Sequence, residues 1–406
     1  MNYDLPANNL YSNKPVRIEI PDDWDVKICS FQNEGKQALT GKQIKDIVHN
    51  AEPSIIQQAR GCHSAVILTD DITRPTTCGK IAKAVISELH KAGLADENIH
   101  FVFATGMHRA MSREEAVRKL RNYIVSNYKV YSHNPFFNCI NIGETSQGVP
   151  IEVNRDVYEA DYKIAIGSLT PHNAVGIGGG SKIVLPGVAS YRAIQTFHTL
   201  TRNDRWNIDS IGKRMTDEFA EAVGLNMKID AMLNGSGEIC ELFTGRPAEV
   251  IPQHYDEIRK AFHTDYDLEA DVVLINNYFK PSETKLAVGG NGLLKNVKKG
   301  TTVIVSSHSP QGNAVHYLFG RWGENDQGGL LYKGLSPVKE NVDKYIVFSE
   351  YMDKGNAESW HYGGEKVTWA QTWKEVLARI PEGKHRMVIY PYASVAYFGE
   401  HGNVDK

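Results

Sequence analysis

The sequence predicts an α/β protein of two α/β domains, whose mainly parallel sheets flank a cleft. Short apolar runs alternate with stretches that carry apolar residues at helical spacing. This alternation starts again after about residue 267, so the chain contains two such series. A length of 406 residues is also sufficient for two hydrophobic cores. We therefore expect one domain over residues 1–266 and a second over 267–406, whose last residues could also pack on the first domain.

The first domain is predicted from strands and helices that alternate along the chain. Strands are predicted at short apolar runs, which have the length of buried parallel strands. Helices are predicted where apolar residues recur every three or four positions, and Ser112 can cap the second of them. In chain order the segments are strand 64–71, helix 76–94, strand 99–106, helix 111–120 and strand 162–169. This order favours a parallel sheet with helices on both faces.

The second domain is predicted from the same kinds of pattern. Apolar runs predict strands over 271–278, 301–307 and 386–392, and helical spacing predicts a helix over 368–380. The domain boundary is placed in the polar stretch before the first of these strands.

Composition and charge exclude several classes of protein. The 45 Lys and Arg residues nearly balance the 48 Asp and Glu residues, and no basic stripe indicates nucleic-acid binding. The polar N-terminus lacks the apolar segment of a signal peptide, and no apolar run has the ~18 to 20 residues that cross a bilayer. The five cysteines are scattered and never form CxxC, which argues against disulfides and structural zinc. We expect a soluble cytoplasmic protein without nucleic-acid or membrane partners.

Polar residues follow three predicted strands of the first domain. Asp71, Thr73 and Arg74 follow the first strand, and His108 follows the second. His172 follows the third. Ligands of open parallel sheets bind beyond the carboxyl ends of the strands, which would bring these side chains to one edge. Each residue also has an ordinary structural interpretation, because Asp71 could cap a helix, Arg74 could form a surface ion pair, and the histidines could be loop residues.

A glycine-rich loop runs from the third strand to Lys182. Its members Gly178, Gly179 and Gly180 permit positive φ and a close approach of backbone N–H groups to an anion. The loop is not a Walker A motif, because Ser181 stands where that motif has glycine and Ile183 follows the lysine. It does not fit the dinucleotide pattern GxGxxG either. The loop therefore indicates phosphate binding without matching either common motif.

A helix is predicted over 190–200, and it contains His198 beside an apolar residue. This histidine is either an ordinary helix-surface residue or a metal ligand, since neutral imidazole is a common ligand for nickel, copper and zinc. One histidine cannot hold a metal by itself. The absence of HExxH from the sequence disfavours a zinc hydrolase.

Together these motifs resemble the nickel-dependent lactate racemase family. The resemblance rests on "DDITRPT" at 70–76, "GMHR" at 106–109, "PHNAVGIGGGSK" at 171–182 and His198. The order and spacing of the motifs match across most of the first domain, which the resemblance identifies as the catalytic and cofactor-binding domain. The second domain would then close the cleft.

The resemblance implies a racemase or epimerase of a small 2-hydroxy acid, supplied with its cofactor by maturation proteins. The cofactor would be a nickel pincer nucleotide, pyridinium-3,5-bisthiocarboxylic acid mononucleotide, through which hydride is reversibly transferred. Lys182 would carry it covalently, and His198 would bind the nickel. Asp71, Thr73 and the three glycines Gly178, Gly179 and Gly180 would contact the cofactor. His108 and His172 would be the two bases, and Arg74 would bind the substrate carboxylate.

The sequence departs from the family in the second domain. Members that act on lactate carry a Tyr-Gln-x-x-Lys pattern there, and it is absent from the corresponding residues 280–300. Lys285 or Lys280 could replace its lysine, and Trp373 either contributes to substrate binding or belongs to the core. We therefore predict a 2-hydroxy acid other than lactate. An oxidoreductase, or a non-catalytic relative that binds a nucleotide or organic anion, stays as an alternative.

Overall fold

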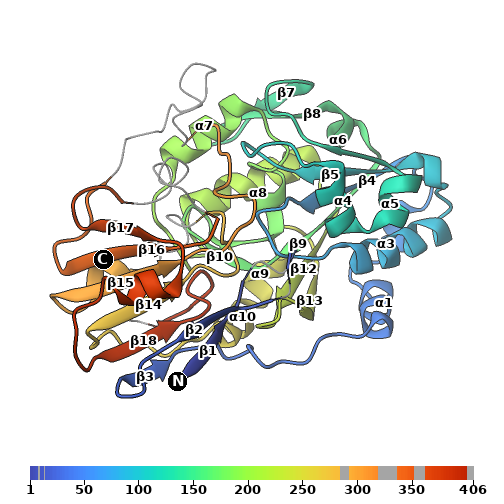
Figure 1. The fold of residues 1–406 in the computed structure, drawn as a ribbon. Helices are drawn as coiled ribbons and strands as arrows, with labels where there is room; N and C mark the ends of the chain where they lie inside the picture. Colours follow the sequence, from blue (N-terminus) through green and yellow to red (C-terminus); the bar gives the residue numbers. More distant parts are fainter. Residues whose placement is uncertain (8–9, 13, 284–291, 319–335, 352–361, 400–406) are drawn as a thin grey trace. The chain divides into compact units, whose positions relative to one another are not determined.

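The computed structural model describes residues 1–7, 10–12, 14–283, 292–318, 336–351 and 362–399. The chain divides into two compact units (Figure 1). Unit 1 consists of Met1–Gly35, Glu257–Val315 and Phe319–Lys406, and unit 2 of Lys36–Asp256 with His316–Leu318. This division differs from the expected 1–266 and 267–406 in three respects. The main boundary falls between Asp256 and Glu257. The N-terminal segment belongs to the C-terminal unit, and a short segment of the C-terminal half belongs to unit 2.

Unit 2 contains a six-stranded sheet in the order β13-β12-β9-β4-β5-β6. Within this sheet β4, β5, β6, β9 and β12 run parallel to one another, and β13 pairs antiparallel with β12. The bounds are β4 Ala65–Asp70, β5 Ile99–Ala104, β6 Lys129–Ser132, β9 Tyr162–Ser168, β12 Met227–Leu233 and β13 Ile239–Gly245. The expected strands at 64–71, 99–106 and 162–169 are thus confirmed as β4, β5 and β9. Their buried apolar runs are typical of parallel strands covered on both faces.

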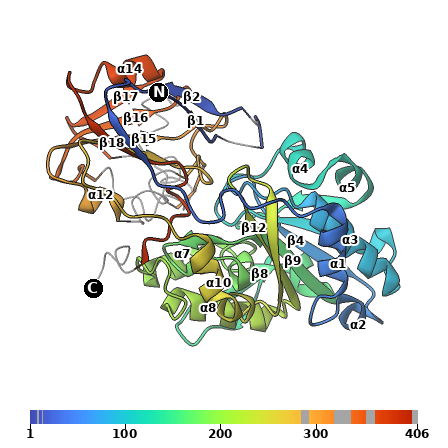
Figure 2. The same cartoon turned by 90° about the horizontal axis from the view of Figure 1, so that it is seen from below.

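The helices of unit 2 cover both faces of this sheet. From β4 the chain passes through α3 to β5, whereas from β9 it passes through α7 and α8 to β12 on the other side of β4. Right-handed crossovers in opposite directions put helices on opposite faces, and Figure 2 shows α1 and α3 on one side of the strands and α8 on the other. The bounds are α1 Gly41–His49, α2 Ile55–Ala59, α3 Gly79–Lys91, α4 Arg113–Leu120, α5 Asn122–Asn127, α6 Arg155–Glu159, α7 Tyr191–Leu200, α8 Ile211–Val223 and α9 Val250–Gln253.

Caps determine where two of these helices begin. Ser112 precedes α4 and forms a capping box with Glu115, as the sequence predicts. Ser190 precedes α7 and accepts a hydrogen bond from the amide of Ala193. The remaining pieces of unit 2 are the short 3-10 helices η1 Asp96–Asn98 and η2 Gly180–Ile183 and the antiparallel pairs β7 Cys139–Glu144 with β8 Pro150–Asn154 and β10 Thr170–His172 with β11 Gly176–Gly178.

Unit 1 contains a six-stranded sheet in the order β17-β16-β15-β14-β18-β3, in which all neighbours are parallel. The bounds are β3 Asp25–Ile28, β14 Val272–Asn276, β15 Thr301–Ser306, β16 Val342–Phe348, β17 Val367–Ala370 and β18 Arg386–Tyr390, with the antiparallel pair β1 Asn2–Leu5 and β2 Val16–Glu19 beside it. The described helices are α12 Leu293–Asn296 and α14 Trp373–Leu377, and α10 Tyr255–Ala261 contains the boundary between the units.

Pairing of β3 with β18 explains why the N-terminal segment joins unit 1. Asp25–Ile28 adds the edge strand of the sheet, with Val26 opposite Met387. The described C-terminal residues also belong to unit 1, where Phe398 lies in the core. The helix expected over 368–380 is wrong in its first part. Residues 367–370 form β17 beside β16, and the helix begins only after Thr372, whose side chain caps α14.

Both faces of the unit 1 sheet are buried. Alternate residues of β14 enter opposite cores, with Val273 and Ile275 in one and Val272 and Leu274 in the other. This is the arrangement of a parallel sheet covered on both sides.

Candidate active site

Three strand ends of unit 2 meet at one edge of its sheet. β4 lies between β5 and β9, with Asp70 opposite Ala104 and Thr69 opposite Ile166. The chain leaves β4 toward β5 but leaves β9 in the opposite direction, so the order reverses between β4 and β9. Such a reversal point is where open α/β sheets bind ligands. The structure therefore brings the three predicted loops to the edge where a site is expected.

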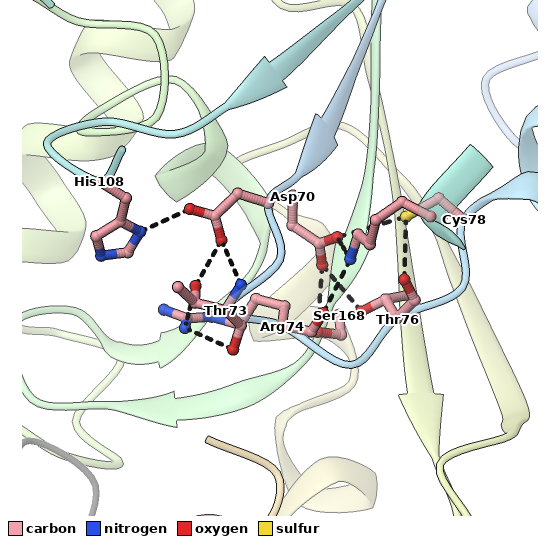
Figure 3. A network of polar contacts seen from close by, with 9 residues as sticks. Asp70, Thr73, Arg74, Thr76, Cys78, His108 and Ser168 are labelled. Atoms are coloured by element: carbon pink, nitrogen blue, oxygen red, sulfur yellow. Dashed lines mark hydrogen bonds and ion pairs between the residues drawn. The ribbon is translucent and has the colours of Figure 1, made fainter. Parts of the chain in front are cut away.

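The loop after β4 holds the imidazole of His108 through Asp71 (Figure 3). The Nδ1 atom of His108 lies 2.6 Å from Oδ2 of Asp71. The other carboxylate oxygen of Asp71 accepts hydrogen bonds from the backbone N–H of Thr73, at 2.9 Å, and from its hydroxyl, at 2.5 Å. A carboxylate at Nδ1 favours the tautomer with the proton on that nitrogen, so Nε2 of His108 carries the lone pair of a base.

Asp71 stays ionised in this setting. Burial by itself raises the pKa of its carboxyl, but the charge and hydrogen bond of His108 oppose that effect. Arg74 and the Thr73 hydroxyl contribute in the same direction, and together these groups lower the pKa to about 2. The expectation that Asp71 merely caps the following helix is not what the structure shows, since Cys78 precedes α3 and makes no capping bond.

Arg74 is fixed at both its backbone and its side chain. Its guanidinium donates to the Thr73 hydroxyl at 2.9 Å, and its carbonyl accepts a hydrogen bond from Lys119 Nζ at 2.9 Å. Lys119 is completely buried and also lies 2.5 Å from Asp70. This buried ion pair, which the sequence analysis did not identify, holds the loop that carries Asp71 and Arg74.

A second buried ion pair holds the glycine-rich loop that leads to Lys182. Lys228 and Asp230 of β12 lie 2.5 Å apart, and the other carboxylate oxygen of Asp230 accepts the N–H of Gly180 at 2.8 Å. A Cβ atom on Gly179 would lie 3.0 Å from Asp230. The loop glycines are therefore required in part by internal packing, and the N–H of Gly180 is donated to the protein. Contrary to the expectation, this N–H binds the carboxylate of Asp230 and not an external anion.

Lys182 and His198 are brought together with His108. Burial lowers the pKa of His198 to about 3, and the charges of Lys182 and His108 add to this effect. Lys182 and His108 therefore both lie within electrostatic range of His198. The hydroxyl of Ser181, next to Lys182, is buried and has no hydrogen-bond partner. A polar group of a bound ligand could supply one.

His172 is held in a different way from His108. It ends β10, and its Nδ1 atom accepts the N–H of Ala174 at 3.1 Å. The neutral ring therefore carries its proton on Nε2, the opposite of the tautomer favoured at His108. The two predicted bases thus present different groups, a lone pair from His108 and an N–H from His172.

A third histidine, His316, lies beside His108 and His198. Its ring centre is 5.2 Å from that of His108 and 6.1 Å from that of His198. It escaped the sequence analysis because "SPQGNAVHY" has no pattern that indicates a site, and because its neighbours along the chain belong to unit 1. Topology, and not local sequence, places it here.

Three residues of unit 1 were considered for substrate binding, and the structure describes two of them. Trp373 is a core residue, since its ring packs 5.6 Å from that of Phe348 and its indole N–H donates to the carbonyl of Glu19 at 2.7 Å. This packing agrees with the core interpretation of Trp373. Lys280 is buried, and its amide donates to the carbonyl of Asn277 at 2.7 Å. Lys285 lies outside the described residues.

The described residues show neither a cluster of metal ligands nor a membrane-spanning helix. They contain no group of three or more His, Cys, Asp or Glu side chains arranged to hold a metal ion. None of their helices has the length and apolar character needed to span a membrane.

Comparison with known proteins gave consistent matches. Residues 11–209 match the family model described as the lactate racemase N-terminal domain. Lactate racemase from Lactiplantibacillus plantarum is 28% identical over 363 residues, which cover 84% of this chain and 81% of the relative. Lactate racemase from Thermoanaerobacterium thermosaccharolyticum is 24% identical over 398 residues, or 93% of this chain and 85% of the relative.

Solved structures support the same fold. The lactate racemase apoprotein from Thermoanaerobacterium thermosaccharolyticum matches with a TM-score of 0.72 at 19% identity, covering 98% of this chain and all of that chain (100%). A protein from Thermotoga maritima matches with a TM-score of 0.63 at 16% identity, covering 90% of this chain and 100% of that chain. At these identities the two structures show the fold alone.

Proposed function

The chain belongs to the lactate racemase family, and from this premise we propose that it racemises or epimerises a 2-hydroxy acid by reversible hydride transfer. The cofactor would be a nickel pincer nucleotide joined to Lys182. One observation carries the proposal. The rings of His198 and the Asp71-bound His108 both contact the ring of His316, and the charge of Lys182 acts on His198.

The residues present fit this cofactor. Neutral imidazole is the form that binds nickel, and burial beside Lys182 lowers the pKa of His198, which keeps its ring neutral. The unpartnered hydroxyl of Ser181 lies next to the lysine, where a nucleotide has polar groups to satisfy it. When bound, the cofactor supplies a reversible acceptor for the hydride that leaves Cα of the substrate.

The protein's own residues bind the substrate and move its hydroxyl proton. The Arg74 guanidinium suits the substrate carboxylate, because its planar donors match two oxygens. His108 takes the hydroxyl proton at Nε2, and the Asp71 carboxylate stabilises the imidazolium that forms. The substrate passes through its 2-keto form, and its carbonyl oxygen is reprotonated from the opposite side, where His172, protonated from solvent, is the second candidate. The proton held by His108 then passes to solvent.

The substrate is proposed to be a 2-hydroxy acid other than lactate. The basis is the missing Tyr-Gln-x-x-Lys pattern, since the lysine of that pattern contributes to substrate binding in relatives that act on lactate. A more polar or larger acid is the expected alternative, and a panel of single enantiomers tests this directly.

Co-expression with cofactor-maturation proteins, followed by intact mass and nickel analysis, tests the proposal. We expect added mass and nickel in the parent protein. Lys182→Ala should lose the added mass, and His198→Ala should keep the mass but lose nickel. Lys129→Arg replaces an exposed lysine and serves as the control, which should match the parent. A parent protein that gains no mass under these conditions contradicts the tether, and one that gains mass but racemises no acid in the panel contradicts the activity.

A further inference from the structure

A three-residue segment joins unit 2 from within unit 1 sequence. His316–Leu318 belongs to unit 2, although the chain before and after it belongs to unit 1. We call this segment the strap. His316 forms an antiparallel bridge with His108, and the N–H of Tyr317 donates to the carbonyl of Met107 at 3.0 Å. The strap is thus bonded to the backbone of the loop that carries the predicted base.

The side chains of the strap are fixed as well as its backbone. Leu318 is completely buried, and His316 is 6% exposed. The ring of Tyr317 lies 5.8 Å from that of Phe136, nearly perpendicular to it. The backbone of His316 is therefore held by the base loop on one side and by two packed neighbours on the other.

The ring of His316 lies against the base itself. The ring planes of His316 and His108 meet at 74° with centres 5.2 Å apart, which is an edge-to-face contact. The same ring meets that of His198 at 69° with centres 6.1 Å apart. His316 therefore occupies the space beside both the predicted base and the predicted nickel ligand.

One hydrogen bond does not fix the orientation of an imidazole. The bond from His108 to Asp71 restrains the position of Nδ1, but a joint change of χ1 and χ2 can still turn the ring while that bond is kept. Such a turn would swing Nε2, the atom that takes the proton, away from the substrate. A second ring at an edge-to-face distance blocks that turn, because rotation would bring the two rings into overlap.

We propose that His316 is a positioning residue for His108, which acts through ring contact; the inference rests on the function proposed above. It sets the plane of the base, so that Nε2 points toward the substrate hydroxyl. The contact requires a flat ring of this size, and it does not require the nitrogen atoms of that ring.

Two substitutions of similar volume separate ring contact from other roles. His316→Phe keeps a flat ring, whereas His316→Leu fills the space without one. In the cofactor-loaded enzyme we expect His316→Leu to lower kcat about tenfold with little change in KM, because small misplacements of a catalytic group cost about 10- to 100-fold. His316→Phe should restore kcat to within about twofold of the parent. His385→Ala removes a half-buried edge-to-face ring beside Trp24 in unit 1 and is the matched control, with parental kcat expected.

A second measurement does not depend on the cofactor. In histidine-labelled apoprotein, the NMR signals of His108 should keep their shift and line width in His316→Phe, and should broaden or split in His316→Leu. Equal loss of kcat in both variants, or unchanged His108 signals in His316→Leu, would overturn the positioning role. Failure of the proposed function looks different, since the parent protein itself would then lack added mass or racemase activity while the NMR comparison still decides the role of His316.

Discussion

Asp71→Asn tests the geometry of the predicted base most directly. The substitution keeps the size of the side chain but removes its charge, and it replaces one oxygen by an NH₂ group. In the protein, Asp71 accepts one bond from His108 at 2.6 Å and two from Thr73. An asparagine that keeps its oxygen toward Thr73 turns its NH₂ toward His108. This arrangement favours the tautomer that leaves Nε2 without a lone pair.

The expected loss of kcat is estimated from the charge of the Asp71 carboxylate. Its pKa is lowered to about 2 despite burial, which is roughly two units below the ordinary value and corresponds to about 2.5 kcal/mol in favour of the ionised form. A hydrogen bond to a charged group contributes about 1.5 to 3 kcal/mol, so losing the carboxylate's stabilisation of the imidazolium should lower kcat by roughly 10- to 150-fold. The KM for the substrate should change little, because Arg74 and not Asp71 is expected to bind the carboxylate.

The assay follows each enantiomer by chiral chromatography at saturating substrate, on enzyme whose cofactor content is verified by intact mass. Asp161→Asn is the control. Asp161 also accepts three hydrogen bonds, from His63 and Ser64, but it lies at the opposite edge of the same sheet. We expect parental kcat from this control. An Asp71→Asn enzyme with full cofactor and kcat within threefold of the parent would refute the assignment of His108 as an Asp71-oriented base.

Three predictions concern stability. Lys119→Met leaves Asp70 as an uncompensated buried charge and should destabilise the fold by about 3 to 5 kcal/mol, measured by urea unfolding. Gly176→Ala places a Cβ atom 2.2 Å from the Asn207 carbonyl and should strongly lower the melting temperature. Gly148→Ala, also at positive φ (83° against 77°) but with open space around it, should cost only about 1 to 2 kcal/mol. Burial lowers the pKa of His133 to about 4, so the unfolded chain binds more protons below its ordinary pKa of about 6.5. The free energy of unfolding should fall by about 3 kcal/mol between pH 6.5 and 4 on this account, and His133→Gln should reduce that fall.

The sequence was sufficient to predict what depends on local pattern. β4, β5 and β9 are apolar runs of strand length, and their chain order with the intervening helices implies a parallel sheet. Because the carboxyl ends of parallel strands share an edge, the grouping of Asp71 with His108 followed from topology. The hydrogen bond between them is the direct product of that grouping.

Other features depend on pairings between distant segments, and local pattern carries no trace of them. β3 has only four residues and becomes a strand because β18 offers an unpaired edge, so the domain boundary could not be read from the chain. Likewise, the position of Asp230 depends on the pairing of β12 with β9, which brings the Asp230 carboxylate to the N–H of Gly180. The glycines that suggested an anion site are therefore partly occupied by an internal anion, which the sequence contains but does not place.

His316 could not be predicted for two reasons: its local sequence has no pattern, and its place depends on pairing with a distant segment. A histidine in an irregular loop has no periodicity that assigns it to a core or a site, and the surrounding chain belongs to the other unit. Yet a backbone bridge and a ring contact at 5.2 Å join it to the predicted base. A site built on strand ends can therefore recruit a residue that no motif contains, provided that backbone pairing fixes the residue as firmly as the strands fix the others. If this reasoning holds, the effect of His316→Leu should disappear in an Asp71→Asn background, because a base with the wrong tautomer gains nothing from correct orientation.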